Sequence, residues 1–532
     1  MATSTTGHPH LTVVQGTVSG VHAYSQEEKT AFVEYLNLRL AGDPDLASLL
    51  PIPSDGEELF RVVGNGILLC KLVNNTKPGT IEERFINKKP RLSVFEIHEN
   101  LNLALNSAKA IGCSLINIGA VDMIEGRPHL VLALIWQLMR LGMTSKINLV
   151  DHPELFRLLE EGESLDTFRK QPPEAILMRW FNYHLRKANH PATHAVTNFS
   201  SDVKDSINYT VLLHQIAPQH CDLSGLDEPN LEARATKVLD DSLKLGCHRI
   251  IMPRDICSGN SKLNTTLVAE LFNAWPALEP PEDLSKLQVV IDDENSAESR
   301  EERAFRNWIN NLGIEGNINN LFTDLQDGLI LLQVIDRLRP GKINWSRVNR
   351  TPKLIFKKHE NTNYAVQMAQ ELGCRVVGFD GRNITEGNKL YTLALTWQLM
   401  RFHVLNFLKE MSASSGGGRE ITEQVLVEMM NNKLSAAGKQ TRIRDLHDPS
   451  LQTAFPLLDL VAAVEPRAID ESLIRRSDPL TAEDKTFNAK YAIAAARKIG
   501  CAIFCVHEDI TQGKDKLIMT FIAQCLSVQN HH

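Results

Sequence analysis

Four cysteines at recurring places are the first residues here that could do chemistry. Each follows a glycine directly, as Cys113, Cys247, Cys374 and Cys501. A thiolate metal site or a redox pair needs further ligands at a fixed spacing, and none recur around these positions. We therefore predict that these cysteines are small buried core residues.

Two histidines and two tryptophans also recur. His98 and His359 each precede Glu-Asn, and Trp136 and Trp397 lie within apolar stretches. We expect the histidines to make a structural cap or an inter-helix hydrogen bond at the start of a helix, rather than to act in catalysis. We expect the tryptophans to anchor a core.

Motifs of catalysis and of cofactor or metal binding are missing from the sequence. It contains no G-x-S-x-G, no P-loop and no H-E-x-x-H. Two acidic stretches, residues 43–54 and 292–303, lack both the turn glycine and the final glutamate of a calcium loop. We therefore predict a protein that is not an enzyme and that has no cofactor and no metal site.

Basic residues gather at matching places in the two halves of the chain. Lys88 and Lys89 lie in one half, and Lys357 and Lys358 lie in the other. Such a cluster is often only a solvated face, but its recurrence makes an acidic partner surface an equal alternative.

These residues belong to an internal repeat. Residues 98–140 match residues 359–401 without a gap at an offset of 261, and residues 234–275 match residues 485–526 more weakly at an offset of 254. The first and third modules therefore resemble each other, as do the second and fourth, in an A-B-A-B order.

Each module contains the pattern of four main helices, which predicts a compact all-α module. In the first module we expect helices at 27–40, 67–73, 100–111 and 130–141, the third ending at Gly112. First helices are also expected at 174–188, 301–312 and 422–434, and second helices at 209–216, 329–338 and 456–464. Short apolar runs at 115–118 and 376–377 are expected to be buried connectors.

The composition fits a helical, cytoplasmic protein. The chain has 532 residues, a formal net charge of −7 and 43% hydrophobic residues. Residues 279–303 account for a net −6 of that charge, so the rest is nearly neutral and no nucleic-acid partner is indicated. The start is not a signal peptide, and no apolar run is long enough to span a membrane. The composition of 412–418, SASSGGG, predicts a flexible joint in the second half.

The recurring phrases resemble those of calponin homology domains. They are the Asn-Gly phrase at Asn65–Asn74, the Glu-Asn helix at Ile97–Leu105 and the closing helix at Leu132–Met139. Two type 1–type 2 pairs in one chain resemble the fimbrin/plastin family. The resemblance predicts a first domain at 23–147 after a tail at 1–22, a second at 171–279, an acidic linker at 280–297, a third at 298–410 and a fourth at 419–530.

This resemblance implies an actin-filament bundler that works as a monomer through two tandem actin-binding domains. The contacts it implies are Lys88, Lys89, Arg140, Leu141 and Lys146 in the first pair, and Lys357, Lys358, Arg401 and Phe402 in the second. Animal fimbrins carry EF-hands ahead of the first domain, where this chain has some twenty residues, so we expect bundling to be insensitive to calcium. The alternative is a cytoskeletal scaffold that binds one actin filament through its first pair and a different partner through its second.

Overall fold

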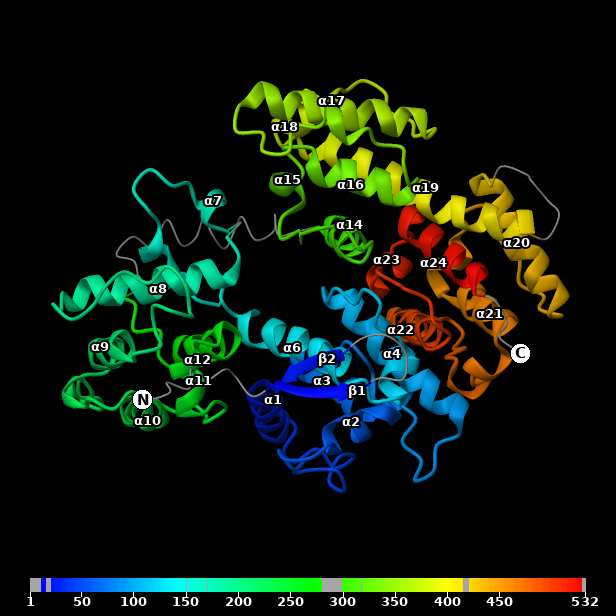
Figure 1. The fold of residues 1–532 in the computed structure, drawn as a ribbon. Coiled ribbons are helices and arrows are strands. Elements are labelled where there is room, and N and C mark those ends of the chain that lie inside the picture. Colours follow the sequence, from blue (N-terminus) through cyan, green and yellow to red (C-terminus); the bar gives the residue numbers. More distant parts are fainter. Residues whose placement is uncertain are drawn as a thin grey trace. The chain divides into compact units, whose positions relative to one another are not determined.

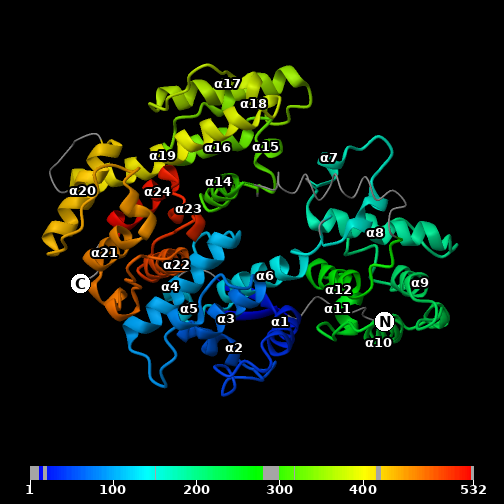
Figure 2. The ribbon, with the colours of Figure 1, turned by 180° about the vertical axis from the view of Figure 1, so that it is seen from behind.

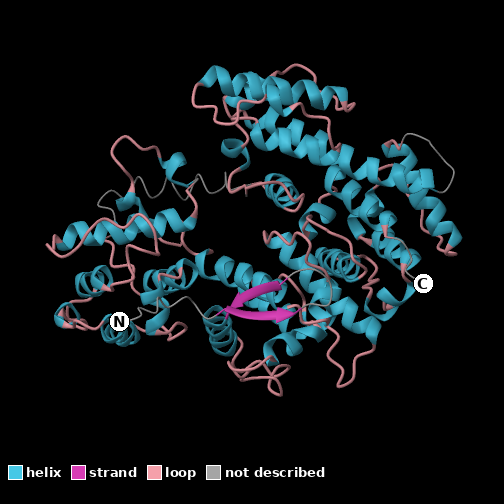
Figure 3. Cartoon of the chain, in the orientation of Figure 1, coloured by secondary structure: helices cyan, strands magenta, loops and turns pink. Residues whose placement is uncertain are grey.

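The computed structural model describes residues 11–15, 21–149, 151–169, 171–279, 299–316, 318–414 and 421–528 (Figure 1). Contacts divide the chain into two units. Unit 1 comprises Met1–Gly64, Asn75–Lys77 and Val121–Ala297, and unit 2 comprises Asn65–Asn74, Pro78–Ala120 and Glu298–His532. Among the described residues, helices are the only regular secondary structure apart from one two-stranded ribbon, and loops connect them (Figure 3). The all-α fold class is thus confirmed for the four domains.

Unit 1 begins with this ribbon, in which β1 (Leu11–Gln15) pairs antiparallel with β2 (Val21–Ser25) and Leu11 lies opposite Ser25. Ser25 then caps the next helix by accepting a hydrogen bond from the Glu28 amide (3.2 Å). The helices that follow are α1 (Gln26–Arg39), α2 (Glu58–Val62), α5 (Ala120–Ile124), α6 (Pro128–Thr144), α7 (Leu165–Arg169), α8 (Pro173–Ala188), α9 (Ile207–Ile216), α10 (Leu231–Lys244), α11 (Pro253–Ser258) and α12 (Ser261–Ala274). Short 3-10 turns are η1 (Val63–Asn65), η3 (Pro153–Leu158) and η4 (Ser224–Asp227).

Unit 2 contains two helices of the first module and all helices of the last two modules. Its longer helices are α3 (Ile67–Thr76), α4 (Val94–Ile111), α14 (Arg300–Asn310), α16 (Leu329–Leu338), α17 (Ile355–Glu371), α19 (Lys389–Ser414), α20 (Glu423–Ala436), α21 (Phe455–Val464), α22 (Ala482–Lys498) and α24 (Asp515–Ser527). The shorter ones are α15 (Leu321–Asp324), α18 (Gly381–Thr385) and α23 (His507–Thr511), with 3-10 turns η2 (Glu83–Phe85), η6 (Trp345–Arg347), η7 (Pro449–Thr453), η8 (Pro466–Ala468) and η9 (Glu471–Leu473).

The third helix of the first module begins earlier than the sequence predicted. Ser93 and Glu96 form a capping box, so α4 begins at Val94 and not near Asn100. His98 therefore lies inside the helix, where its Nδ1 bonds the Val94 carbonyl of the same helix (2.9 Å). This bond is neither the helix cap nor the inter-helix hydrogen bond that the sequence predicted, so that prediction was wrong for His98. The predicted end is confirmed, because Gly112 closes α4 in the left-handed conformation (φ 115°).

Two predictions about connections need correction or lie outside the described residues. Val377 was expected in a buried connector but is 83% exposed, and Val376 before it is only half-buried. The joint at 412–418 was expected to begin at Ser412, but α19 continues to Ser414. The glycines of this joint, and the whole acidic linker at 280–297, lie outside the described residues.

The recurring cysteines are core residues, as predicted. Cys113, Cys247, Cys374 and Cys501 are all buried. Burial raises the pKa of the Cys247 thiol to about 12 and that of Cys374 to about 11. Trp397 is buried and stacks on Phe305. The Cys247 and Cys374 thiols therefore stay protonated and act as small apolar side chains.

A buried asparagine explains the Glu-Asn phrase of the repeat. Asn361 of α17 donates its amide to the carbonyls of Asp327 (3.0 Å) and Asn349 (2.9 Å), and its Oδ1 accepts from the Asn349 amide (2.9 Å). Asn100 makes the same bonds in the first module. The asparagine satisfies backbone groups of two loops at once, and thereby fixes the start of the second helix against the third.

Helices α4 and α22 lie side by side in unit 2, far apart in sequence (Figures 1 and 2). The Asn102 and Asn106 amides donate to the carbonyls of Lys498 and Arg497, both at 3.0 Å. Next to them, the ring of Phe85 stacks on Tyr491 at 5.0 Å between centroids. The first and fourth modules therefore share a contact that is polar at one end and aromatic at the other.

Candidate functional site

The predicted arginines of the closing helices are tied to the next module. In unit 1, Arg140 of α6 pairs with Glu174 of α8 at 2.5 Å. In unit 2, Arg401 of α19 pairs with Glu423 of α20 at 3.1 Å. The arginine side chains remain 39% and 30% exposed. The same tie between a type 1 and a type 2 module is thus built twice.

A second repeated tie was missed by the sequence reasoning. Lys262 of α12 forms an ion pair with Glu28 (2.9 Å), and its Nζ lies 5.9 Å from the ring centroid of Trp136. This ring in turn stacks on Phe32. The lysine therefore bridges the first and last helices of the neighbouring module.

The second half repeats this bridge with its own residues. Lys516 of α24 pairs with Glu301 (2.7 Å) and lies 5.8 Å from the ring centroid of Trp397. Lys262 and Lys516 occur at the repeat offset of 254. Their recurrence in an otherwise weakly matched pair of modules was a signal available in the sequence.

Lys88 and Lys89 of the first module have carboxylate partners of their own. Lys88 pairs with Glu83 (2.7 Å), and the more exposed Lys89 pairs with Glu96 (2.7 Å). The hydrogen bond that Lys89 donates to Glu96 lowers the pKa of Glu96 to about 2, and the same bond raises the pKa of Lys89. Lys89, 72% exposed, is the better placed of the two to reach a partner.

The equivalent place in the third module combines cations with exposed apolar side chains. Lys357 pairs with Glu360 (2.9 Å), and Lys358 next to it is half-buried. Directly before them, Leu354, Ile355 and Phe356 are 57%, 62% and 51% exposed. Sequence reasoning missed these three residues, although an apolar triplet before a lysine pair does not fit the buried stripe of an amphipathic helix.

The remaining predicted contacts lie in or just after the closing helices. Lys146 is exposed after the end of α6, whereas Leu141 and Phe402 are half-buried. Each half thus offers exposed or half-exposed cations near apolar side chains, which suits a partner surface of carboxylates and apolar groups.

Within the described residues, His, Cys, Asp and Glu side chains nowhere gather in threes that could hold a metal ion. Among the helices that the structure describes, none has both the length and the apolarity that a membrane crossing needs.

Known proteins resemble this chain along almost its whole length. The calponin homology (CH) domain family matches residues 26–144, 171–277, 299–404 and 420–530. Fimbrin of Dictyostelium discoideum is 46% identical over 520 residues, covering 96% of this chain and 82% of the relative. Human Plastin-1 is 44% identical over 518 residues, covering 95% and 80%.

A solved structure agrees with these relatives. The crystal structure of the actin-crosslinking core of Schizosaccharomyces pombe fimbrin matches with a TM-score of 0.79 and 38% identity, and covers 95% of this chain and 100% of that one. With its CH domains and its similarity to fimbrins and plastins from end to end, this protein belongs to the fimbrin/plastin family.

Proposed function

We propose that this protein binds actin filaments through each of its two domain pairs and crosslinks them into tight bundles as a monomer. It acts by binding, not as an enzyme, in the cytoplasmic actin cytoskeleton. The observation that carries the proposal is the duplicated pair: the ties Arg140–Glu174 and Arg401–Glu423 join a type 1 to a type 2 module in both halves. The match to a fimbrin core described as actin-crosslinking supports it.

Each pair would contact the filament with cations and neighbouring apolar groups. In the first pair we propose Lys88, Lys89, Arg140, Leu141 and Lys146, and in the second Lys357, Lys358, Arg401 and Phe402. The exposed Val94 (73%) joins the first set, and Leu354, Ile355 and Phe356 join the second. Because Arg140 and Arg401 already pair with a glutamate, filament carboxylates would compete with Glu174 and Glu423. The exposed lysines Lys89 and Lys146 would contribute more.

Sedimentation of filaments with the full chain tests both heads. The wild-type chain should pellet filaments at low speed, equally with calcium and with a chelator. The double variant Lys357→Glu, Lys358→Glu should still pellet with filaments at high speed through the first pair, but should no longer bundle them. Arg444→Glu with Arg467→Glu, which reverses two exposed cations of the fourth domain (79% and 68%), is the charge-matched control and should bundle normally.

The same assay separates bundling from the scaffold alternative. A wild-type chain that binds filaments at high speed but leaves them in the low-speed supernatant has one filament-binding head, and that result would refute bundling. The second pair would then bind a different partner.

A further inference from the structure

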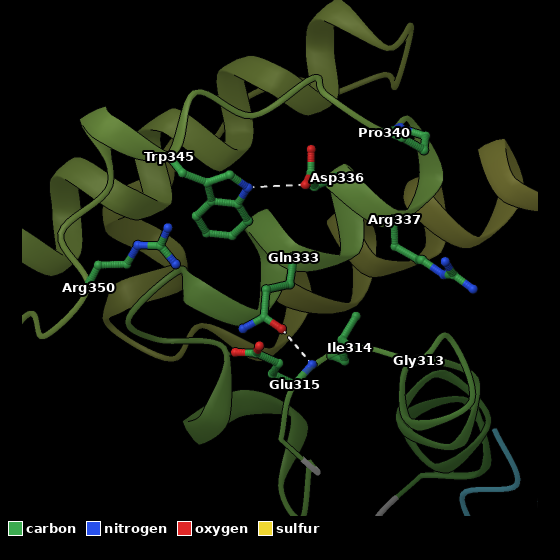
Figure 4. A pocket seen from close by; sticks show the side chains of 9 residues that line it. All are labelled: Gly313, Ile314, Glu315, Gln333, Asp336, Arg337, Pro340, Trp345 and Arg350. Carbon is green, nitrogen blue, oxygen red and sulfur yellow. Dashed lines mark hydrogen bonds between the residues drawn. The ribbon is translucent and has the colours of Figure 1, made fainter. Parts of the chain in front are cut away.

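A polar hollow of about 460 Å³ lies on the third domain, between α16, the loop after it and the turn after α14 (Figure 4). Its floor is tied together by hydrogen bonds. Asp336 accepts from the Trp345 indole (3.1 Å) and from the Gly341 amide (3.1 Å), and Gln333 accepts from the Glu315 amide (2.8 Å). The floor groups are therefore already paired, and recognition falls to the side chains of the wall.

Trp345 and Arg350 form one wall of this hollow. The Arg350 guanidinium carbon lies 4.6 Å from the centroid of the indole ring. Arg350 is exposed, and among the described residues no carboxylate pairs with it. Stacking on an aromatic face orients a guanidinium while leaving its N–H edge open to a planar anion.

The other domains show what a cation at the aligned position binds. The backbone amides of Asn87, Asn349 and Arg475 each donate to the buried asparagine of the following helix, which aligns the three loops. The next residue is a cation in every case: Lys88, Arg350 and Arg476. Trp345 is the first residue of η6, as Glu83 is of η2 and Glu471 is of η9.

A glutamate therefore occupies the place of Trp345 in the first and fourth domains, and it pairs with the cation aligned to Arg350. In the first domain Glu83 lies 2.7 Å from Lys88 and 2.5 Å from Lys71. In the fourth, Glu471 lies 2.9 Å from Arg476 and 2.8 Å from Lys439.

The second domain has Leu223 after its turn-capping Asp222, where the third has Trp345 after Asn344. Of the domains with a cation aligned to Arg350, only the third lacks the carboxylate.

We propose that this hollow binds an acidic peptide segment of a protein partner, with one side-chain carboxylate on the N–H edge of Arg350 and the peptide packed on Trp345. A carboxylate is favoured over a phosphate because the sibling domains hold a carboxylate there. The lining also balances Arg337 and Arg350 against Glu315 and Asp336, which gives little attraction to a multiply charged anion. The volume suits one or two side chains. This proposal does not depend on filament binding.

Fluorescence anisotropy of a labelled, N-acetylated and C-amidated hexaglutamate tests it on the full chain at low salt. Arg350→Gln should weaken binding at least about tenfold, because it removes a charge-assisted pair. Trp345→Glu should weaken it similarly, because the new glutamate occupies Arg350 as Glu83 occupies Lys88. Arg347→Gln, which removes a neighbouring cation that lies over Tyr364 and outside the hollow, should change binding less than about twofold.

Three results would overturn the proposal: hexaglutamate does not bind, it binds all variants equally, or a hexaglutamine peptide binds as well. Arg350-dependent binding of inositol hexakisphosphate without binding of hexaglutamate would also overturn it in favour of a phosphate site. A melting curve shows whether Trp345→Glu is destabilised. If it is, Arg350→Gln still tests the proposal, because Arg350 is an exposed side chain and its replacement leaves the fold intact.

Discussion

Glycine at the start of the second helix shows how a single residue fixes the fold of each type 1 domain. Gly328 has φ +77°, and a Cβ there would lie 2.8 Å from the Thr362 amide and 2.9 Å from the Asn361 carbonyl carbon. Gly341 has nearly the same φ (+79°) but open space around it. Comparing alanine at the two glycines therefore separates two free-energy costs. One is the cost of a left-handed backbone in a non-glycine residue, and the other is the cost of the close approach to α17.

We expect Gly341→Ala to lower the free energy of unfolding by about 1 kcal/mol through its backbone conformation alone. Gly328→Ala should lower it by about 3 kcal/mol or more, because α17 must also move away. Urea unfolding of both variants measures the difference. If both variants lose the same free energy of unfolding, α17 moves away from the new Cβ at position 328 without a free-energy cost.

Burial of a histidine predicts acid sensitivity in the second domain. His184 lies against Trp180, with its Nε2 at 3.2 Å from the Pro276 carbonyl, and burial lowers its pKa to about 4. A lowered histidine pKa means that the unfolded chain binds the proton first. Stability is therefore lost as the pH falls below about 6.5, by about 2 kcal/mol at pH 5.

Between pH 7 and pH 5 the midpoint temperature of unfolding should fall, as measured by calorimetry. We expect this fall to be smaller in the His184→Gln variant than in the wild-type chain. His220→Gln, an exposed histidine of the same domain, serves as the control. The comparison with wild type is needed because Asp255, whose pKa burial raises to about 6, shifts stability in the opposite direction. An unchanged drop in the His184 variant would contradict the prediction.

At the residue scale, side chains whose role is local could be predicted from the sequence. The cysteine after a helix-ending glycine is buried in every module because the backbone turn places it under the helix. The partners of Lys262 or Arg140 could not be predicted, since they depend on how one module meets the next. Of the predicted contact residues, Arg140 and Arg401 pair with a glutamate of the next module, a role that spacing alone does not reveal.

At the scale of elements, we expect the two ends of the contact between α4 and α22 to contribute unequally to the stability of the fold. At the polar end, burial lowers the pKa of Arg497 to about 10, and its guanidinium donates to the Ile503 carbonyl (3.0 Å) and to the Ser107 hydroxyl (3.4 Å). Among the described residues no carboxylate pairs with it. A buried cation without a carboxylate contributes little net stability. We therefore expect the aromatic end, where Phe85 stacks on Tyr491, to contribute more stability than Arg497 does.

Phe85→Ala should accordingly lower the free energy of unfolding by about 3–4 kcal/mol, as for other buried phenylalanines. Arg467→Ala removes only an exposed cation over Phe95 and should cost less than about 1 kcal/mol. Guanidinium unfolding of the full chain measures both. A loss below about 1 kcal/mol for Phe85→Ala would mean that the stacking of Phe85 on Tyr491 is not the main source of stability in this contact.

The elements themselves were largely predictable because each has its own signals. Leu329–Leu338 was predicted to the residue, since Gly328 begins that helix and Pro340-Gly341 follow it. The start of α4 was missed because Ser93 and Glu96 act as a cap six residues before the apolar pattern becomes regular. The side-by-side placement of α4 and α22 could not be predicted, because its residues have no shared spacing in the sequence.

At the scale of the molecule, bundling requires that both heads bind filaments at once. Once one head is bound to an aligned filament, the second head faces its target at a high effective concentration, so loss of one head removes crosslinking but not attachment. A chain with one working head should therefore act as a competitor.

Adding an excess of the Lys357→Glu, Lys358→Glu variant to filaments bundled by the wild-type chain should return filaments to the low-speed supernatant. The variant occupies first-head sites without bridging, so the effect should grow with the ratio of variant to wild type. The Arg444→Glu, Arg467→Glu chain, with both heads intact, should leave the bundles in the pellet. If the second-head variant adds to the pellet as the control does, then Lys357 and Lys358 do not carry the second filament contact, and the exposed triplet at 354–356 becomes the place to change next.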